Sequence, residues 1–420
     1  MEKNNKNNQR GQVRGNSAPL KIKNAGTVES TELIENKYYS NIAYRVKWIK
    51  WLSRVFLVLF FFAGIIFYPR EVNVENFGYL LRYINIQGSG KSVKSEFQIE
   101  LDEASSICYY KNNIAVLRKN RLDIYDMNGR KNYTSKLVYS IPVLRTSDKY
   151  LIAYDLGTNK MGIFNSFSKL YEYKGDRPVY FAEITNKGNI VYVTSEKKYQ
   201  SAVNIMNNGF NIVYRCLYDK DWVMSADIDD KAETLAVAGY CVKDGDYLSK
   251  VSLYDTRFEE VKSQIEIIGE IPYSVKLNQS GIFAVFENSI RFYDLKGDEI
   301  TKYHFSYRKI QKIALAPKAA AVVLNEKTLG TDDRILIFDV NGNILYDDVV
   351  NSEVMDINFS DDYQFLYYIT RTGLYKITVA QGASELVPGA YDETADDIIY
   401  ANEKNIYLSG LLKINILNID

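Results

Sequence analysis

The chain has 420 residues, and 52 Lys and Arg balance 52 Asp and Glu, so its formal net charge is zero. Over the whole chain this excludes the basic excess of a nucleic-acid-binding protein and electrostatic attraction to an anionic membrane. A single histidine leaves little material for acid–base or metal chemistry, whereas 35 Tyr and 19 Phe favour β-strands.

The chain begins with a polar segment. Residues 1–28 are rich in Asn, Lys and Gly and contain few large apolar side chains. Such a segment buries too little surface to offset its conformational entropy. We therefore expect residues 1–47 to form a disordered, basic tail.

An apolar segment follows, and it predicts a transmembrane helix over residues 48–69. Val55–Tyr68 contains no charge but has only 14 residues, whereas a span requires about 20. Extension back to Trp48 reaches that length if Lys50 and Arg54 snorkel to the headgroups. A cleaved signal peptide and a buried core helix are the weaker alternatives. The residues expected to anchor the helix at the membrane are Trp48, Trp51, Arg54 and Tyr68.

The distribution of charge predicts the orientation of this helix. Residues 1–54 contain 11 Lys and Arg but four Glu, a net charge of +7, so the remaining residues carry −7. The positive-inside rule places the N-terminus in the cytoplasm and everything after the helix outside it. The lipid bilayer is thus the first expected partner of the chain, through the helix. Residues 70–92 are expected to form a juxtamembrane linker with a short amphipathic helix.

The rest of the chain, residues 93–420, is built from repeats. An alternating apolar segment recurs, ends on a polar residue and is often followed by a turn, as in LDIYDMNG and IRFYDLKG. Alternation with period two indicates a strand, and Asp-x-Asn-Gly indicates a tight turn. The polar residues that end these segments are Asp126, Asn165, Asn207, Asp255, Asp294, Asp339, Thr378 and Asn418.

Each segment is preceded by two further strand patterns and followed by a fourth. Four antiparallel strands in about 40 residues are typical of one blade of a β-propeller. The fold class predicted is therefore all-β, an eight-bladed β-propeller, with seven blades or an open solenoid as alternatives. The last repeat lacks a fourth strand, and Ser95–Leu101 is expected to supply it and close the ring.

The turns between first and second strands carry a resemblance to a known class of proteins. INFSDDYQFLYYI (357–369) and VKLNQSGIFAVF (275–286) resemble the FSPDG-like hairpin of WD40-type propellers. The Gly-His and Trp-Asp marks and the repeated Trp motif of quinoprotein propellers are missing. The whole layout resembles a family of uncharacterised membrane-anchored propellers of AT-rich Gram-positive bacteria. That resemblance implies fold and location, and it transfers no catalytic residue.

Residues that could carry chemistry have simpler structural interpretations. His304 falls on an expected outer strand without the partners of a catalytic triad. Cys108, Cys216 and Cys241 form no C-x-x-C motif, so we expect buried free thiols, with a 216–241 disulfide as the alternative. The acidic clusters at 227–230 and 361–362 are interpreted as turn residues rather than calcium ligands. No catalytic residue, metal site or cofactor is predicted.

Two insertions between second and third strands are more informative. VKDGDYLSK (242–250) and NEKTLGTDDR (325–334) should emerge on the same face of the propeller, where loops on a rigid scaffold often bind partners. Neutral lengthening of the loops is the alternative. The candidate contact residues are Asp244, Asp246, Tyr247, Thr331, Asp332, Asp333 and Arg334.

These observations favour a non-enzymatic binding scaffold or sensor at the cell envelope. Its expected partner is an envelope protein or wall polymer, and no nucleic acid. The alternative is a propeller-fold enzyme, a lyase or glycan hydrolase, which would need paired carboxylates or a basic–tyrosine cluster in the central channel. A propeller that faces the cytoplasm would require the charge rule to fail.

Overall fold

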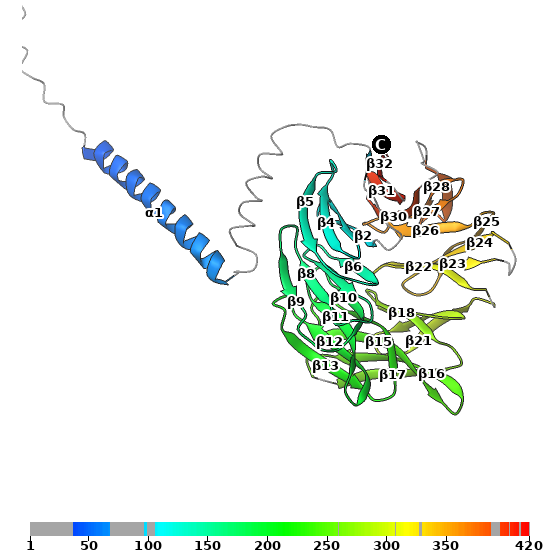
Figure 1. The fold of residues 1–420 in the computed structure, drawn as a ribbon. Helices are drawn as coiled ribbons and strands as arrows, with labels where there is room; N and C mark the ends of the chain where they lie inside the picture. The colour runs from blue at the N-terminus through cyan, green and yellow to red at the C-terminus, as the bar shows by residue number, and fades with distance from the viewer. Residues whose placement is uncertain are drawn as a thin grey trace, which may run out of the picture. The chain divides into compact units, whose positions relative to one another are not determined.

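The computed structural model of this chain describes residues 37–67, 96–98, 106–258, 260–306, 308–326, 330–387, 395–402, 404–410 and 413–419. The chain divides into two compact units, Met1–Val72 and Asn73–Asp420. The first unit contains one described helix, α1, and the second contains all the described strands (Figure 1).

Helix α1 runs over Lys37–Phe67 and is longer at its N-terminal end than predicted. Residues 37–47, which we expected to be disordered, are helical; they contain no Gly or Pro, the two residues that most disfavour a helix. Trp48, Trp51 and Arg54 are exposed on α1, and the two indole rings meet edge to face with centroids 5.5 Å apart. Tyr68 and the linker 70–92 lie outside the described residues.

The transmembrane helix predicted at 48–69 is not supported. Within the part of the chain that the structure describes, no helix combines the length and the apolar character needed to cross a membrane. The physical reason lies in the sequence of α1. Lys50 and Arg54 interrupt its apolar character, and the uncharged stretch that starts at Val55 is shorter than the roughly 20 residues of a span.

The described strands of the second unit form eight four-stranded antiparallel sheets, which are the blades of a propeller. The predicted eight blades are therefore confirmed, and seven blades are excluded. Blades one and two contain β2 (Ser106–Tyr110), β3 (Asn113–Leu117), β4 (Arg121–Asp126), β5 (Lys131–Lys136), β6 (Pro142–Thr146), β7 (Leu151–Asp155), β8 (Met161–Phe164) and β9 (Lys169–Glu172). Blades three and four contain β10 (Val179–Ile184), β11 (Ile190–Glu196), β12 (Tyr199–Met206), β13 (Ile212–Tyr218), β14 (Trp222–Ile228), β15 (Thr234–Lys243), β16 (Asp246–Asp255) and β17 (Glu260–Ile268).

The second half of the propeller repeats this order. Blades five and six contain β18 (Pro272–Leu277), β19 (Gly281–Phe286), β20 (Ser289–Asp294), β21 (Glu299–His304), β22 (Ile310–Leu315), β23 (Ala319–Asn325), β24 (Asp333–Asp339) and β25 (Ile344–Val350). Blades seven and eight contain β26 (Val354–Phe359), β27 (Phe365–Thr370), β28 (Gly373–Thr378), β29 (Ala383–Leu386), β30 (Ala395–Ala401), β31 (Asn405–Gly410), β32 (Lys413–Asn418) and β1 (Glu96–Gln98).

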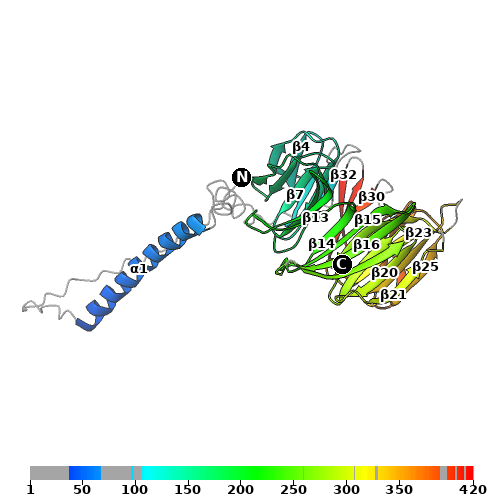
Figure 2. The ribbon, with the colours of Figure 1, turned by 90° about the horizontal axis from the view of Figure 1, so that it is seen from below.

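The blades are arranged radially around a central channel, as Figure 1 shows for the second unit. The first strand of each blade is the innermost, and β2 contacts both β6 and β30, so that the ring is complete. Figure 2 gives the same blades from a direction at right angles to that view. Because strands of all blades point the same way, corresponding turns of different blades gather on the same face.

The core lies between neighbouring blades. The middle strands, such as β3, β7 and β19, are buried along their whole length because other blades cover both faces of the sheet. The outer strands alternate between exposed and partly buried residues, as β21 does. This difference explains why the second strand of each repeat is a continuous apolar run, whereas the fourth is mainly polar.

The third strands end as the sequence predicted, because their final polar side chains bind the backbone of the next turn. The Oδ1 atom of Asp126 accepts the N–H groups of Asn128 and Arg130. Asp339 does the same with Asn341 and Asn343. These turns fix where each third strand stops and so set the period of the repeat.

The ring is closed by pairing of the two ends of the propeller. Strand β1 lies antiparallel to β32 and supplies the outer strand of blade eight, with Phe97 opposite Ile414. This confirms the role predicted for Ser95–Leu101, although the described strand covers only Glu96–Gln98. An open solenoid is excluded, since β2 contacts β30 on the inner side.

Candidate functional site

The propeller has two faces that carry different turns. The turns between first and second strands, and between third and fourth strands, lie on one face, which we call the first-hairpin face. The turns between second and third strands lie on the opposite face, together with the connections between blades. The predicted contact residues belong to the opposite face, because they lie in segments between second and third strands.

The segment 242–250 of blade four is a hairpin of strands and not the predicted loop. Strands β15 and β16 have ten residues each and pair as far as Lys243 opposite Asp246. A two-residue turn joins them, in which Asp244 has φ 53° and Gly245 has φ 91°. Two consecutive positive φ values define the tight turn that matches the twist of a hairpin. The Asp-Gly pair is thus a turn signal that we had interpreted as part of a longer loop.

The blade-four hairpin is longer than its neighbour in blade five. Strands β19 and β20 have six residues each, so the end of the longer hairpin extends beyond them. The side of the hairpin that faces blade five carries Tyr240, Val242 and Tyr247. They lie an even number of residues along their strands from Ala238 or Val251, which belong to the core between these blades. The extension therefore leaves their side chains without a strand of blade five against them.

Three aromatic rings form a cluster on this extension. The rings of Trp222 and Tyr240 stack with centroids 5.6 Å apart, and Tyr240 meets Tyr247 edge to face at 5.7 Å. Trp222 is 42% exposed and Tyr247 is 45% exposed. Asp244 and Asp246 are exposed at the tip of the hairpin. We call Trp222, Tyr240 and Tyr247 the aromatic ledge.

The predicted contact residues of blade six are not equally available. Asp333 is buried, and its Oδ2 atom accepts the N–H of Val354 at the start of β26, 2.8 Å away. Arg334 pairs with Asp347 at 2.6 Å and with Glu326 at 3.5 Å. Asp333 therefore joins blade six to blade seven, and Arg334 holds blade six together. Thr331 is exposed and Asp332 is partly buried, while residues 327–329 lie outside the described residues.

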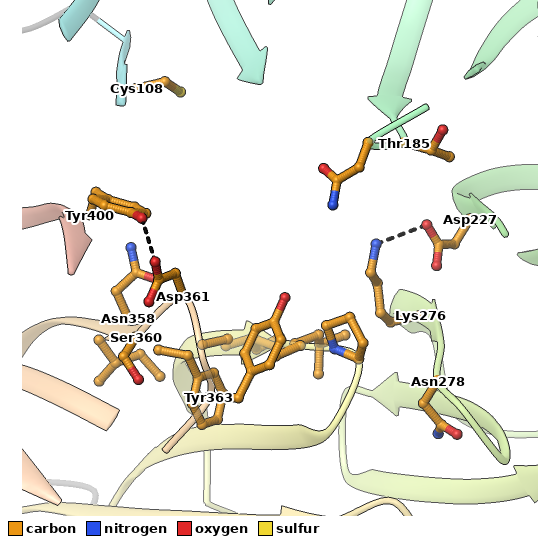
Figure 3. A pocket seen from close by; sticks show the side chains of 18 of the residues that line it. Cys108, Thr185, Asp227, Lys276, Asn278, Asn358, Ser360, Asp361, Tyr363 and Tyr400 are labelled. Atoms are coloured by element: carbon orange, nitrogen blue, oxygen red, sulfur yellow. Dashed lines mark hydrogen bonds and ion pairs between the residues drawn. The ribbon is translucent and has the colours of Figure 1, made fainter. Parts of the chain in front are cut away.

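A second candidate site lies in the central channel. A cavity of about 820 Å³ is lined by the ends of first strands and by first-hairpin turns, with β2, β10, β14, β18, β22, β26 and β30 all represented. Figure 3 shows side chains from opposite sides of the ring that converge on this space. Ligand pockets commonly have volumes of about 300–1,000 Å³, so the cavity is large enough for a small ligand.

Two ion pairs join neighbouring first strands in or beside the channel. Lys276 of β18 contacts Asp227 of β14 at 2.9 Å, and Asp227 also accepts the N–H of Leu277 (Figure 3). Arg145 of β6 contacts Glu183 of β10 at 2.8 Å. Burial raises the pKa of Asp227, and the charge of Lys276 opposes that shift. The expectation that Asp227 is a turn residue is wrong, since it lies within β14 and is buried.

Two carboxyl groups meet between β26 and β30. Burial, followed by the charge of Asp397 and a hydrogen bond between the two side chains, raises the pKa of Asp356 to about 8. The Oδ2 atom of Asp356 also accepts the N–H of Ile398 at 2.9 Å. At neutral pH the Asp356 carboxyl therefore keeps its proton, because two carboxylates in contact cannot both ionise easily.

Tyrosines line the channel beside this carboxyl pair. The Tyr400 hydroxyl donates to Asp361 at 2.8 Å, and its ring stacks on Tyr109 with centroids 3.9 Å apart. Tyr363 also lines the cavity, and Figure 3 shows its hydroxyl directed into the open space. The first strands and their turns thus supply both hydrogen-bonding groups and aromatic rings.

The sequence placed the two carboxyl groups of the channel on neighbouring strands but did not show that they touch. Asp356 and Asp397 occupy equivalent places in consecutive repeats, so a propeller of this register brings them to neighbouring inner strands. Their direct contact depends on side-chain directions that spacing does not determine. The other expectations on reactive residues agree with the structure. Cys108, Cys216 and Cys241 are free thiols, although only Cys241 is buried as expected and the other two are partly buried; His304 ends the outer strand β21.

Comparison with known proteins gives the fold but no activity. The sequence model of a family described as being of unknown function, DUF5711, matches residues 85–409. A search of curated proteins found no match.

Three solved propellers illustrate the likeness. The computationally designed Ika8 protein has a TM-score of 0.58 and 10% identity, with 76% of this chain and 98% of that chain covered. BamB from Moraxella catarrhalis has a TM-score of 0.50, 10% identity and coverages of 77% and 98%. The C-terminal WD40 domain of Sif2 has a TM-score of 0.51, 11% identity and coverages of 77% and 99%. At these identities the likeness confirms the propeller resemblance and does not extend to function or to a membrane-anchored group.

Proposed function

The chain belongs to DUF5711, a family of unknown function, and we propose from its own geometry that the propeller is a binding scaffold. The observation that carries this proposal is the aromatic ledge on blade four. The rings of Trp222 and Tyr247 are exposed, both contact the partly buried ring of Tyr240, and all three are held on strands of blade four. Trp and Tyr are the residues that most often dominate the binding energy of an interface, since they supply large contact areas at little entropic cost.

The expected partner is a protein or polymer of the cell envelope that inserts beside the blade-four hairpin, above blade five. The exposed Asp244 and Asp246 at the hairpin tip favour a neutral or basic partner surface. Residues 55–420 carry a net charge of −7, which disfavours nucleic acid as the partner.

Crosslinking and pull-down with the full chain test this proposal. We expect the double variant Trp222→Ala with Tyr247→Ala to lose at least 90% of the captured partner, because both exposed rings are removed. Phe258→Ala is the control, since Phe258 is also an exposed aromatic residue but lies in the turn between β16 and β17 on the first-hairpin face. Equal capture by the double variant and the wild-type chain would refute the aromatic ledge as the docking site.

A second function is favoured by a different observation, the carboxyl pair in the channel. Two carboxyl groups in hydrogen-bond contact can act together as acid and base on one bound water. The separate acid and base of glycoside hydrolases lie about 5–9.5 Å apart, so here the pair would act as one unit that takes a proton from the attacking water and returns it to the leaving-group oxygen. The net reaction would be hydrolysis of an envelope glycan, with the proton returned to the pair. Release of reducing ends by the wild-type chain, abolished by Asp397→Asn, would support this enzyme. Absence of release from purified envelope polymers would exclude it.

We also propose, from the sequence, that the chain is held at the cell membrane with its N-terminus in the cytoplasm and the propeller outside. The support is the separation of a basic N-terminal segment, with a net charge of +7 over residues 1–54, from an acidic remainder. Protease treatment of intact cells tests the location. Degradation of the propeller is expected, and its complete protection would contradict the orientation.

A further inference from the structure

Tyr363 has a backbone conformation that is costly for a large side chain. Its φ is +63°, in the left-handed region, and its N–H donates to Ser360. The corresponding positions of two other first-hairpin turns are Gly188, with φ +83°, and Ala232, with φ +57°. These equivalents also donate to the carbonyl three residues earlier. Small residues therefore suffice for this turn, and a tyrosine there is held in a strained backbone conformation.

The strained conformation places a ring and a hydroxyl group at the central channel. Tyr363 lines the cavity, and its hydroxyl is directed into the open space near Lys276 (Figure 3). The Nζ atom of Lys318 lies 5.6 Å from the centroid of the ring. Part of the ring packs against the core between blades six and seven, so the side chain is held in place. Strained residues are concentrated at ligand sites, where the surrounding structure stabilises them.

The groups around Tyr363 favour a neutral polar ligand. Six carboxyl groups line the cavity, against the single ammonium of Lys276, and this excess opposes anionic ligands. They belong to Asp227, Asp229, Asp230, Asp356, Asp361 and Asp397. Asp227 is paired with Lys276, Asp356 with Asp397 and Asp361 with Tyr400, so these groups are held as oriented hydrogen-bond acceptors.

Uncharged hydrogen-bonding side chains complete the lining. Thr185, Asn358 and Ser360 place hydroxyl and amide groups at the lining. The Asn358 amide donates to the carbonyl of Ile398 and the Ser360 hydroxyl donates to Asp362, so these groups are held in fixed directions. Their combination with the Tyr363 ring matches a ligand that has many hydroxyl groups and an apolar ring face.

We propose that the mouth of the central channel binds a neutral oligosaccharide segment, with Tyr363 as the platform for a sugar ring. This inference goes beyond the scaffold proposal, since the site lies on the first-hairpin face, opposite the aromatic ledge. It concerns binding alone, and it holds whether or not the carboxyl pair performs hydrolysis. The two proposals are tested by different variants, Trp222→Ala with Tyr247→Ala for the scaffold and Tyr363→Ala for the channel. A negative result for one therefore does not contradict the other.

Titration of the full chain with two neutral probes, chitotetraose and maltotetraose, tests the inference by calorimetry. Binding of at least one probe is expected. Tyr363→Ala should weaken that binding at least tenfold, and Tyr363→Phe, which keeps the ring, by less than threefold. The alanine in the equivalent turn of blade four shows that this turn accepts alanine. Tyr363→Asn provides a second ring-free variant, because Asn tolerates left-handed φ values.

The controls separate this site from the rest of the molecule. Trp222→Ala, on the aromatic ledge, should bind the same probe as tightly as the wild-type chain does. Thermal melts of each variant report whether it is folded. The inference is overturned if neither probe binds the wild-type chain, or if both ring-free variants bind as tightly as the wild type. Stronger binding of spermidine in competition with the neutral probe would also overturn it, since it would identify a cation site.

Discussion

Asp123 of β4 is a buried charge that the repeat pattern did not single out. Its Oδ2 atom contacts Arg118 at 2.7 Å and Arg121 at 2.8 Å, and Thr134 donates to Oδ1 at 2.6 Å. Burial raises its pKa, but the hydrogen bond from Thr134 and the charge of Lys131 outweigh this, so that the pKa lies below its usual range. The Asp123 carboxylate therefore joins β4, the third strand of blade one, to the outer strand β5 and to the turn between β3 and β4.

We predict that Asp123→Asn lowers the free energy of unfolding by about 3 kcal/mol, because the buried carboxylate loses its ion pairs with Arg118 and Arg121. Urea denaturation followed by circular dichroism measures the change. Asp298→Asn is the control, since Asp298 is exposed in a turn, and its effect should stay within about 0.5 kcal/mol. An equally small effect of both substitutions would show that the Asp123 network is unimportant for stability.

Strands β26 and β30 are coupled through the Asp356–Asp397 pair, and this coupling makes the stability of the propeller depend on pH. The folded chain keeps a proton on the pair up to about pH 8, whereas an unfolded aspartate loses it near pH 4. Between these values the folded state binds the extra proton. The contribution of this group to the free energy of unfolding is therefore largest below about pH 4. It declines as the pH rises towards 8, by at most about 1.4 kcal/mol per pH unit.

Asp356→Asn is predicted to remove this decline, because an amide has no proton to lose and can still accept the N–H of Ile398. The melting temperature of the variant, minus that of the wild type, should increase steadily from pH 5 to pH 8.5. Asp348→Asn on the exposed part of β25 serves as the control and should change nothing over this range. A constant difference for Asp356→Asn would mean that the Asp356 carboxyl does not keep its proton.

Elements were predictable from the sequence where local chemistry decided them. The third strand of each repeat follows from its alternation and from an Asp or Asn that binds the following turn. The blade-four hairpin was misinterpreted as a loop, since its extension beyond blade five depends on how long the neighbouring strands are. Similarly, Asp333 and Arg334 looked like loop residues, although contacts with Val354 and Asp347 give them structural roles.

At the scale of the whole propeller, closure depends on three residues from the start of the unit. Strand β1 pairs with β32 through Glu96, Phe97 and Gln98. Without it β32 would present an unpaired edge, which promotes association with other chains. The two ends of a propeller must pair because every blade is stabilised mainly by contacts with its neighbours.

Phe97→Pro in the full chain is predicted to break this closure, since proline lacks the N–H and fixes φ. Hydrogen exchange should then speed up in residues 405–418, and the protein should aggregate at a lower temperature. Phe97→Ala keeps the backbone donor and separates the effect of pairing from that of the side chain. Unchanged exchange in β32 of the proline variant would show that β1 is dispensable for closure.

The sequence by itself determined the all-β class, the eight repeats and the strand that closes the ring, because these depend on periodicity and on short turns that bind their own backbone. It also singled out Tyr247, one of the three residues of the aromatic ledge. Only the tertiary structure decided that Trp222 and Tyr240 stack beside Tyr247, that Asp356 keeps its proton beside Asp397, and that Tyr363 faces the channel. These contacts join residues from different strands or blades, and their distances depend on the packing of the closed ring.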